Sequence, residues 1–264
     1  MPPPLIRPDW SLSVISHGHM PSVRRLLRDF RDHLDPERHE VLLTLNIDEP
    51  TDNLERIWPG TITRIANRRR KGFGANHNAA FRRARGRFFA AVDPDLRLHG
   101  DPFAVLQEAL ADPHAGIAST VVLDETGVAA DNARDLPTPA RILRRRLRRE
   151  RRLYRRELER QVQVDWVAGL FMAMRAETFQ TLGGFDERYF LYCEDAELCM
   201  RAWNRGFDVR VVPAAPVTHP ARRQTMKNWR HFRWHVESLA KLWTSDSYRQ
   251  FEAGRGKRRL RPAD

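Results

Sequence analysis

The chain has 264 residues, of which 41% are apolar and 30% charged, with a formal net charge of +12. This length and apolar content predict a folded domain with a sizeable core and exclude a chain that is disordered throughout. The longest apolar or glycine run, WVAGLFMAM at 166–174, is far shorter than the roughly 20 residues needed to span a bilayer. We therefore expect no membrane-spanning helix and, from the amino-terminal sequence, no signal peptide.

The positive charge is concentrated in one segment. Residues 141–160 contain eleven Arg and three Glu, a net charge of +8. Nucleic acid, anionic lipid headgroups and a phosphorylated substrate would each be attracted by such a segment, so charge alone does not choose among them.

Strand and helix patterns alternate along the first half of the chain. The expected strands are 11–16, 40–45, 61–66, 87–92 and 116–123, and the expected helices are 21–34, 74–86 and 102–111. This order predicts an α/β fold with a mainly parallel sheet flanked by helices. Ligands of such sheets bind at the carboxyl ends of the strands.

The pattern resumes after the basic segment. We expect a strand over 163–175, a helix over 176–185 that is capped by a Gly-Gly pair, and a last strand over 207–213 that ends at Pro213. Residues 226–243 predict an amphipathic helix, and 254–264 form a basic tail.

The turn Asp93-Pro94-Asp95 follows an apolar strand directly. Two carboxylates at a strand's carboxyl end suit Mg²⁺ or Mn²⁺, which can hold a diphosphate. The alternative is a plain polar turn, in which Asp serves only as a turn former.

Two further segments have both a structural and a chemical interpretation. Residues 67–78 place glycines and Lys71 before a helix, as a loop near a nucleotide would, but an ordinary helix start has the same composition. Glu194, Asp195 and Glu197 lie at the start of another helix, where acids are favoured by the helix dipole and where one of them could serve as a general base.

The roles expected for the two cysteines and His219 depend on the residues around them in the sequence. Cys193 and Cys199 match no zinc-ligand spacing and are expected to pack as reduced thiols. His219 follows the last strand and becomes a candidate metal ligand only if a metal site already exists.

Together, and in this order, these segments resemble glycosyltransferase family 2, the inverting enzymes of the GT-A fold, and particularly the rhamnosyltransferase-like branch that builds bacterial surface polysaccharides. The likeness covers about residues 11–220. It is most specific over 164–220, which contain a tryptophan-glycine strand, a G-G-F-D-E turn, an E-D helix and a terminal histidine at matching spacing.

The resemblance implies a role for each matching residue. Asp195 would be the catalytic base, with Glu194 as its acidic partner. The implied donor-binding residues are Asn46, Asp48, Lys71, Gly72, Phe73, Asn78, Asp93 and Asp95; the acceptor-binding residues are Trp166, Gly169 and Glu197; the ligands of Mg²⁺ or Mn²⁺ are Asp93, Asp95 and His219.

Three positions depart from the family's usual pattern. LNIDEPTD stands where the family often has Asp-Asn-x-Ser, so either Asn46 or Asp48 would contact the base. Glu197 stands where Asp is more usual, and Cys193 where an aromatic residue is common, which leaves their own roles open.

The resemblance implies an inverting transfer of a sugar from a nucleotide-diphosphate donor to a saccharide acceptor that is lipid-linked. Leu143, Leu147, Tyr154 and Leu158 form a narrow apolar stripe in the basic segment, so Arg141–Arg160 is interpreted either as a helix on an anionic membrane surface or as a solvated insertion. Two other functions are alternatives to a glycosyltransferase. A sugar nucleotidyltransferase would have a glycine-rich amino-terminal signature, which this sequence lacks. A nucleic-acid-binding protein would leave the acidic residues unexplained.

The expected organisation is a GT-A domain over 1–225, with the arginine-rich insertion at 138–160, followed by an amphipathic helix and basic tail over 226–264. The expected location is the cytoplasm, with peripheral attachment to the inner face of the plasma membrane.

Overall fold

The computed structural model describes residues 7–129, 132–134, 138, 160–219 and 229–254. The arginine-rich insertion and the basic tail therefore lie almost entirely outside the described residues. The strands are β1 Trp10–Ser16, β2 His39–Leu45, β3 Ile62–Ala66, β4 Phe88–Val92, β5 Arg97–Leu98, β6 Ala115–Leu123, β7 Ala133–Arg134, β8 Val162–Gln163, β9 Trp166–Val167, β10 Phe171–Arg175 and β11 Asp208–Thr218.

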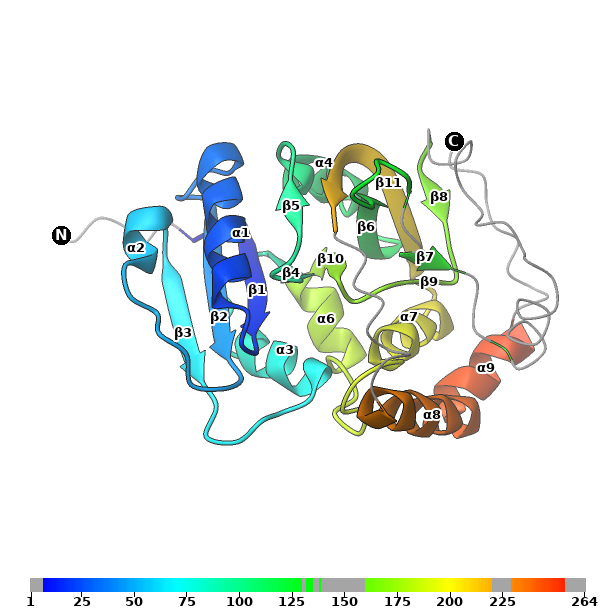
Figure 1. The fold of residues 1–264 in the computed structure, drawn as a ribbon. Helices are drawn as coiled ribbons and strands as arrows, with labels where there is room; N and C mark the ends of the chain where they lie inside the picture. Colours follow the sequence, from blue (N-terminus) through cyan, green and yellow to red (C-terminus); the bar gives the residue numbers. More distant parts are fainter. Residues whose placement is uncertain (1–6, 130–131, 135–137, 139–159, 220–228, 255–264) are drawn as a thin grey trace.

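Nine of these strands form one mixed sheet in the order β3-β2-β1-β4-β10-β6-β11-β5, with β8 paired to β11 (Figure 1). Strands β1 to β4 run parallel, whereas β10 runs antiparallel to both β4 and β6. The expectation of an α/β fold with a mainly parallel sheet is confirmed. The carboxyl ends of β1, β2 and β4 consequently meet at one edge, and the amino end of β10 meets them there.

The helices are α1 Met20–His33, α2 Leu54–Ile57, α3 Phe73–Phe81, α4 Pro102–Ala109, α6 Ala176–Leu182, α7 Glu194–Asn204, α8 Trp229–Thr244 and α9 Asp246–Gly254. Local sequence explains several of their ends. The carboxylate of Asp101 accepts the Phe103 N–H at 2.8 Å and so caps α4. Gly183, with φ of 80°, ends α6 as predicted, because glycine adopts this left-handed conformation without strain.

The core has two layers because the central strands are buried on both faces. In β4, Phe88, Ala90 and Val92 join the core beneath α1 and α4, whereas Phe89 and Ala91 face the opposite core with α6 and α7. Successive side chains of a strand point to opposite faces, so an uninterrupted apolar strand supplies both layers.

Three expected boundaries were wrong, and one helix was missed. Helix α3 ends at Phe81, five residues before Gly86. The single strand expected over 163–175 is divided into β9 and β10 by the turn at 168–170. Strand β11 continues through Pro213, because its register against β6 shifts between Val212 and Val217 and such an irregularity tolerates a residue without an N–H. Helix α9 was not expected.

The carboxy-terminal helices pack onto the same body as the sheet. The Oγ of Ser247, in α9, donates to Glu197 Oε1 of α7 at 2.8 Å, and the Nδ2 of Asn204 donates to the Ser247 carbonyl at 2.9 Å. The proposed division at residue 225 stays a prediction. Within the described ranges, no helix has the length and hydropathy that crossing a bilayer requires.

Candidate active site

The turn after β4 holds Asp93 at the carboxyl edge of the sheet. The Asp93 N–H donates to the Leu170 carbonyl at 2.8 Å, and Asp93 Oδ1 accepts the Asp95 N–H at 2.8 Å. The second contact is the side-chain-to-backbone bond typical of aspartate in turns. It fixes the direction of the Asp93 carboxylate, of which about a third is exposed, since 32% of its side chain remains accessible.

His219 reaches the same place from the end of β11. Its backbone N–H donates to Leu123 at 2.8 Å, and its Nε2 lies 3.7 Å from Asp93 Oδ1. The surrounding protein acts to raise the pKa of Asp93, but His219, the Asp95 N–H and the charge of His19 outweigh this and leave the pKa below its usual value. Asp93 is therefore held in its charged form.

Asp93 and His219 are two of the three side chains predicted to bind a metal ion, and the structure brings them together. Among the residues that the structure describes, no three His, Cys, Asp or Glu side chains gather as a cation-binding group. Asp93 and His219 nevertheless offer one carboxylate and one imidazole, ligand types that suit Mn²⁺ and, for the carboxylate, Mg²⁺. The assignment of Asp95 as a third ligand stays a prediction.

The predicted base Asp195 lies in the first turn of α7, as its sequence position indicated. The Gly169 N–H donates to Asp195 Oδ2 at 2.9 Å, and the Ala196 N–H donates to Oδ1 at 2.8 Å. Gly169 immediately precedes Leu170, which contacts Asp93, so the turn between β9 and β10 joins both acidic segments. A Cβ at residue 169 would come within 2.9 Å of the Phe73 ring and 3.5 Å of Asp195 Cβ, which explains why glycine stands there.

Glu194 differs from its neighbour. Only 4% of the residue is exposed, and within the described structure its Oε2 has no hydrogen-bond partner. Burial, and then the adjacent charge of Asp195, raise the pKa of Glu194 well above its usual value. Glu194 therefore keeps its proton at higher pH than an exposed glutamate would, which does not suit a general base.

A strained turn that the sequence did not reveal precedes α7. Tyr192 and Cys193 have φ of 74° and 68°, in the left-handed region that residues other than glycine seldom adopt. The Tyr192 hydroxyl lies 2.8 Å from His231 Nδ1, which helps to hold this conformation. Consecutive strained residues beside a reacting group are typical of functional sites. Neither residue type signals such backbone geometry.

Both cysteines are free and buried, as expected for packing residues. Burial, foremost, raises the pKa of the Cys193 and Cys199 thiols far above the usual range, so they remain protonated and poorly nucleophilic.

An amide network connects the end of β2 with the segment before α3. Asn46 Oδ1 accepts the Lys71 N–H at 2.8 Å and Asn67 Nδ2 at 3.0 Å, and Asn46 Nδ2 donates to the Lys71 carbonyl at 3.0 Å. The structure thus brings Asn46 and Lys71 together, while Asp48 lies exposed on the same loop. Which of Asn46 and Asp48 contacts the base stays open. Asn67 was missed, and only its proximity to the basic run could have suggested it.

The predicted nucleotide-side residues are packed against the loop that leads into α7. The Phe73 N–H donates to the Phe190 carbonyl at 2.9 Å, and a Cβ at Gly72 would meet that carbonyl oxygen at 2.5 Å. Asn78 donates to the Phe185 carbonyl and accepts the Phe185 N–H, both at 2.8 Å. Donor binding by Asn78 stays a prediction, but its amide already serves to fix the turn at 184–187.

His77, also missed, lies beneath these residues. Its Nδ1 is 2.8 Å from the Ser13 hydroxyl, and its ring is 4.4 Å from that of Phe73. Burial lowers the pKa of His77 to about 3, although the charge of Asp93 acts in the opposite direction. The His77 imidazole is therefore neutral, and it packs between Ser13 and Phe73 beneath the candidate active site.

The structure places the other two expected acceptor residues in packed positions. Trp166 is 8% exposed and belongs to the core on β9. Glu197 binds Arg201 through both oxygens at 2.7–2.9 Å, and Arg201 also donates to the carbonyls of Leu182 and Gly184. Acceptor binding by Trp166 and Glu197 stays a prediction.

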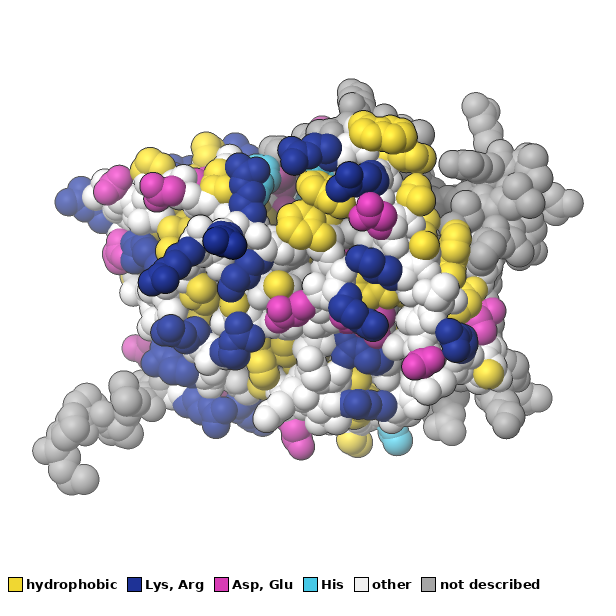
Figure 2. All heavy atoms as spheres, turned by 90° about the horizontal axis from the view of Figure 1, so that it is seen from below, with side chains coloured by type: hydrophobic (Ala, Val, Ile, Leu, Met, Phe, Trp, Pro, Cys, Tyr) yellow, Lys and Arg dark blue, Asp and Glu magenta, His cyan; other side chains and the backbone are white. Residues whose placement is uncertain are grey.

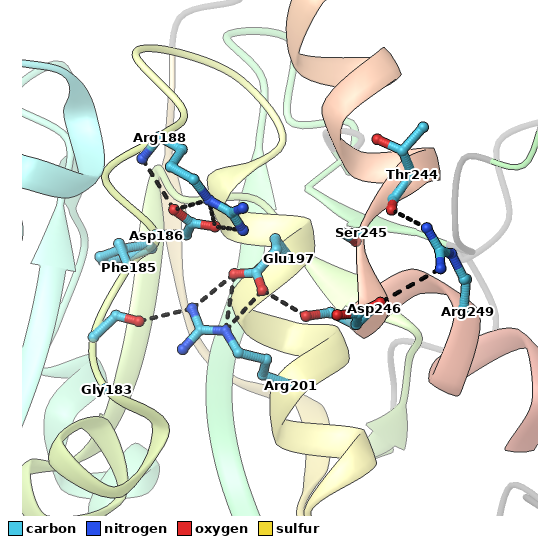
Figure 3. A pocket seen from close by; sticks show the side chains of 12 residues that line it. Gly183, Phe185, Asp186, Arg188, Glu197, Arg201, Thr244, Ser245, Asp246 and Arg249 are labelled. Carbon is cyan, nitrogen blue, oxygen red and sulfur yellow. Dashed lines mark hydrogen bonds and ion pairs between the residues drawn. The ribbon is translucent and has the colours of Figure 1, made fainter.

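Glu197 and Arg201 line a pocket of about 550 Å³ between residues 183–188, α7 and residues 244–249. Figure 3 shows their side chains next to each other, with Asp246 and Arg249 contributed by the junction of α8 and α9. Three arginines and three acids line the pocket and cancel in charge. It joins α7 to the carboxy-terminal helices and does not contain Asp195.

Solved structures of similar shape are glycosyltransferases. Superposition gives a TM-score of 0.63 with GalNAc-T7 bound to UDP, GalNAc and Mn²⁺, at 19% identity, over 81% of this chain and 43% of that one. It gives 0.59 with the mannosyltransferase PcManGT from Pyrobaculum calidifontis in complex with GDP-Man and Mn²⁺, at 17% identity, over 96% of this chain and 77% of that one. The fold is the GT-A fold of glycosyltransferases.

Sequence comparison identifies the family of glycosyltransferases to which the chain belongs. Residues 45–236 match the model of the glycosyltransferase like family 2, and the chain belongs to this family. It is 26% identical to rhamnosyltransferase WbbL of Escherichia coli K12 over 85% of this chain and 89% of WbbL. It is 34% identical to N-acetylglucosaminyl-diphospho-decaprenol L-rhamnosyltransferase of Mycobacterium tuberculosis over 51% of this chain and 47% of that enzyme. The chain is a glycosyltransferase, and neither a nucleotidyltransferase nor a nucleic-acid-binding protein is supported.

Proposed function

We propose that this glycosyltransferase moves a deoxyhexose of the rhamnose type from a nucleoside diphosphate to a hydroxyl of a saccharide carried on a lipid diphosphate, during bacterial surface-polysaccharide synthesis. The two rhamnosyltransferases that it resembles support the sugar, and the N-acetylglucosaminyl-diphospho-decaprenol of the mycobacterial enzyme's name supports the acceptor. We place the reaction at the inner face of the plasma membrane, where such an acceptor would be met.

The observation that carries the proposal is the position of Asp195. Two backbone N–H groups hold its carboxylate, at 2.9 and 2.8 Å, one of them from the turn whose next residue contacts Asp93. This arrangement fixes the Asp195 carboxylate beside the edge of the sheet where the donor diphosphate would bind. Asp195 is therefore oriented as a general base.

The reaction follows as a single displacement. Asp195 takes the proton from the acceptor hydroxyl while that oxygen attacks the anomeric carbon from the face opposite the diphosphate. The bond to the diphosphate breaks as the new glycosidic bond forms, so the configuration at the anomeric carbon is inverted. No second carboxylate nucleophile is required, in contrast to retaining glycosidases.

Asp93 and His219, with Asp95 as the remaining candidate, would hold a divalent cation. Their ligand chemistry fits Mg²⁺ or Mn²⁺. When bound, the cation would neutralise charge on the leaving diphosphate. The chain's own contribution is to keep Asp93 charged through His219 and directed by the Asp95 N–H.

A transfer assay tests this function. The purified chain is incubated with a panel of nucleoside-diphosphate sugars and an N-acetylglucosaminyl lipid diphosphate, and products are identified by mass. We expect a deoxyhexose donor to give one inverted product, with loss of turnover in EDTA and recovery with Mg²⁺ or Mn²⁺. Absence of transfer from every donor with cation present would overturn the proposal.

A further inference from the structure

Helix α8 carries most of the large exposed hydrophobic side chains that the structure describes. In the described part of the chain the large exposed hydrophobic residues are Phe190, Trp229, Phe232 and Val236, and Trp229 is 75% exposed. The last three occur at i, i+3 and i+7 of α8 and so form one stripe, which we call the outer stripe. Single exposed apolar residues are ordinary, but this concentration indicates a surface that contacts something else.

The opposite side of α8 is fixed to the loop that leads into α7. The Ser238 hydroxyl donates to the Leu191 carbonyl at 2.9 Å, and Lys241 Nζ donates to the Arg188 carbonyl at 2.9 Å. The Phe190 ring lies 4.9 Å from that of Trp234, also in α8. Because these bonds end in residues 188–191, the outer stripe has a fixed orientation relative to Asp195, the second residue of α7.

Positive charge lies beside the outer stripe. Arg230 and Arg233 directly follow Trp229 and Phe232 in α8, and the helix as a whole, with Lys241 and Glu237, has a net charge of three minus one, or +2. On the other side of Phe190, the loop 68–71 has four consecutive exposed cations, and Gly72 joins it to Phe190 by close packing. Figure 2, seen from the side where α8 lies in Figure 1, shows hydrophobic side chains among many Lys and Arg side chains.

Exposed aromatic rings flanked by cations suit the headgroup region of an anionic bilayer. Tryptophan and phenylalanine enter the boundary between headgroups and acyl chains, while nearby Arg and Lys are attracted to the negative surface. A second protein would be expected to provide a comparably large acidic surface, whereas anionic lipid supplies such charge over any area.

We propose that the outer stripe, together with Arg230 and Arg233 of α8 and the cations of loop 68–71, docks this enzyme on anionic membrane lipid. This inference rests on the proposed function only in its purpose, which is to present Asp195 to an acceptor anchored in the same membrane. It rests on residues other than 141–160, which lie almost wholly outside the described residues.

Vesicle co-sedimentation of the full chain tests the surface directly. We compare phosphatidylcholine vesicles with vesicles that also contain phosphatidylglycerol. The aromatic variant is Trp229→Ser with Phe232→Ser, and the charge variant is Arg230→Gln with Arg233→Gln. We expect binding only to anionic vesicles, and a fall in partitioning of about tenfold in each variant.

The control is Arg25→Gln with Arg28→Gln, which removes the same charge from exposed positions on α1. It should bind as the unmodified chain does, and thermal unfolding should be the same for all variants. Failure of the unmodified chain to bind anionic vesicles would overturn the proposal, as would equal loss in the α1 control. Unchanged vesicle binding by the aromatic variant, with reduced self-association in sedimentation, would instead identify the stripe as a contact between two copies and overturn the lipid assignment.

A second measurement separates this proposal from the proposed function. Transfer is measured with the acceptor embedded in vesicles and with a short, water-soluble acceptor analogue. The aromatic variant should lose transfer to the embedded acceptor by about tenfold and retain transfer to the soluble one. If the unmodified chain used neither acceptor, the proposed function would fail while vesicle binding would still decide the docking surface.

Discussion

Two pairs of acidic residues lie near one edge of the sheet, and the pKa of one acid is shifted in opposite directions in the two pairs. After β4, Asp93 is partly exposed, lies beside His219 and has a pKa below its usual value. At the start of α7, Glu194 is buried beside Asp195 and has a raised pKa. The difference teaches that adjacent acids acquire separate roles from their surroundings, since burial opposes the charged form and a nearby cation favours it.

The largest expected effect separates the two acids of α7. Asp195→Asn should lower the turnover rate by about 10²–10⁴-fold because a general base is removed, with donor affinity little changed. Glu194→Gln should retain turnover within about tenfold, because glutamine resembles a protonated glutamate in shape and hydrogen bonding. Steady-state rates at saturating donor and acceptor measure both. Equal losses in the two variants would show that both acids act in charged form.

The second effect concerns the acids after β4. Asp93→Asn should weaken donor binding by about 10- to 100-fold, because it removes the charge beside His219 but keeps an oxygen for the Asp95 N–H. Titration with the nucleotide donor and divalent cation measures the affinity. Asp35→Asn is the matched control, since Asp35 accepts the Glu37 N–H in a similar turn away from the site. Unchanged affinity in Asp93→Asn would exclude Asp93 as a diphosphate or cation contact.

The third prediction tests the turn that joins the two acidic pairs. In Gly169→Ala, the new methyl group would meet the Phe73 ring at 2.9 Å and displace the N–H that holds Asp195. Turnover should fall by up to about 100-fold through misplacement of the base, and stability should fall by about 1–3 kcal/mol through overpacking. Gly100→Ala, where nothing lies within 4 Å, should change neither. Rate assays and denaturant unfolding provide the two readouts, and a fully active Gly169→Ala would contradict the expectation.

The smallest effect extends the comparison to a buried base. The pKa of His77 is lowered from 6.5 to about 3, so between these pH values the unfolded chain binds a proton that the folded chain does not. Because of His77, the free energy of unfolding should fall by about 1.4 kcal/mol for each pH unit below 6.5 within this window. Above pH 6.5, His77 should not change the free energy of unfolding. Denaturant unfolding from pH 7 to 4 should show a shallower slope for His77→Gln. The exposed His33→Gln should keep the original slope; equal slopes for all three proteins would exclude this role.

Periodicity and turn residues predicted most of the fold. The strands before Asp93 and the helix at α7 follow from local patterns, because their apolar spacing agrees with their burial. Pro213 wrongly indicated the end of the last strand, since the tolerance of β11 for proline arises from a register shift against another strand. The division at 168–170 was equally invisible, because its cause is the contact of Gly169 with Asp195 from a distant segment.

Candidate site residues could be named where a residue type suggests the chemistry, but not where backbone geometry does. Asp93, Asp195 and His219 were candidates because carboxylate and imidazole groups fit the expected chemistry and the family resemblance implied a role for each; those roles stay predictions. The strained Tyr192 and Cys193 could not, because their φ values come from the path of the chain between Phe190 and α7. The packing of His77 likewise depends on β1, far earlier in the sequence.

The pair of hydrogen bonds between Asn78 and Phe185 has a consequence for the order in which parts of the enzyme fold during synthesis. A separation of 107 residues lies between the two partners, and Gly184 also packs against Asn78, where a Cβ would meet Oδ1 at 2.5 Å. During synthesis, strands β1 to β4 leave the ribosome long before the turn that secures α3. Contacts of such high sequence separation cost the most loop-closure entropy, so α3 is secured to this turn only after residue 185 has been made.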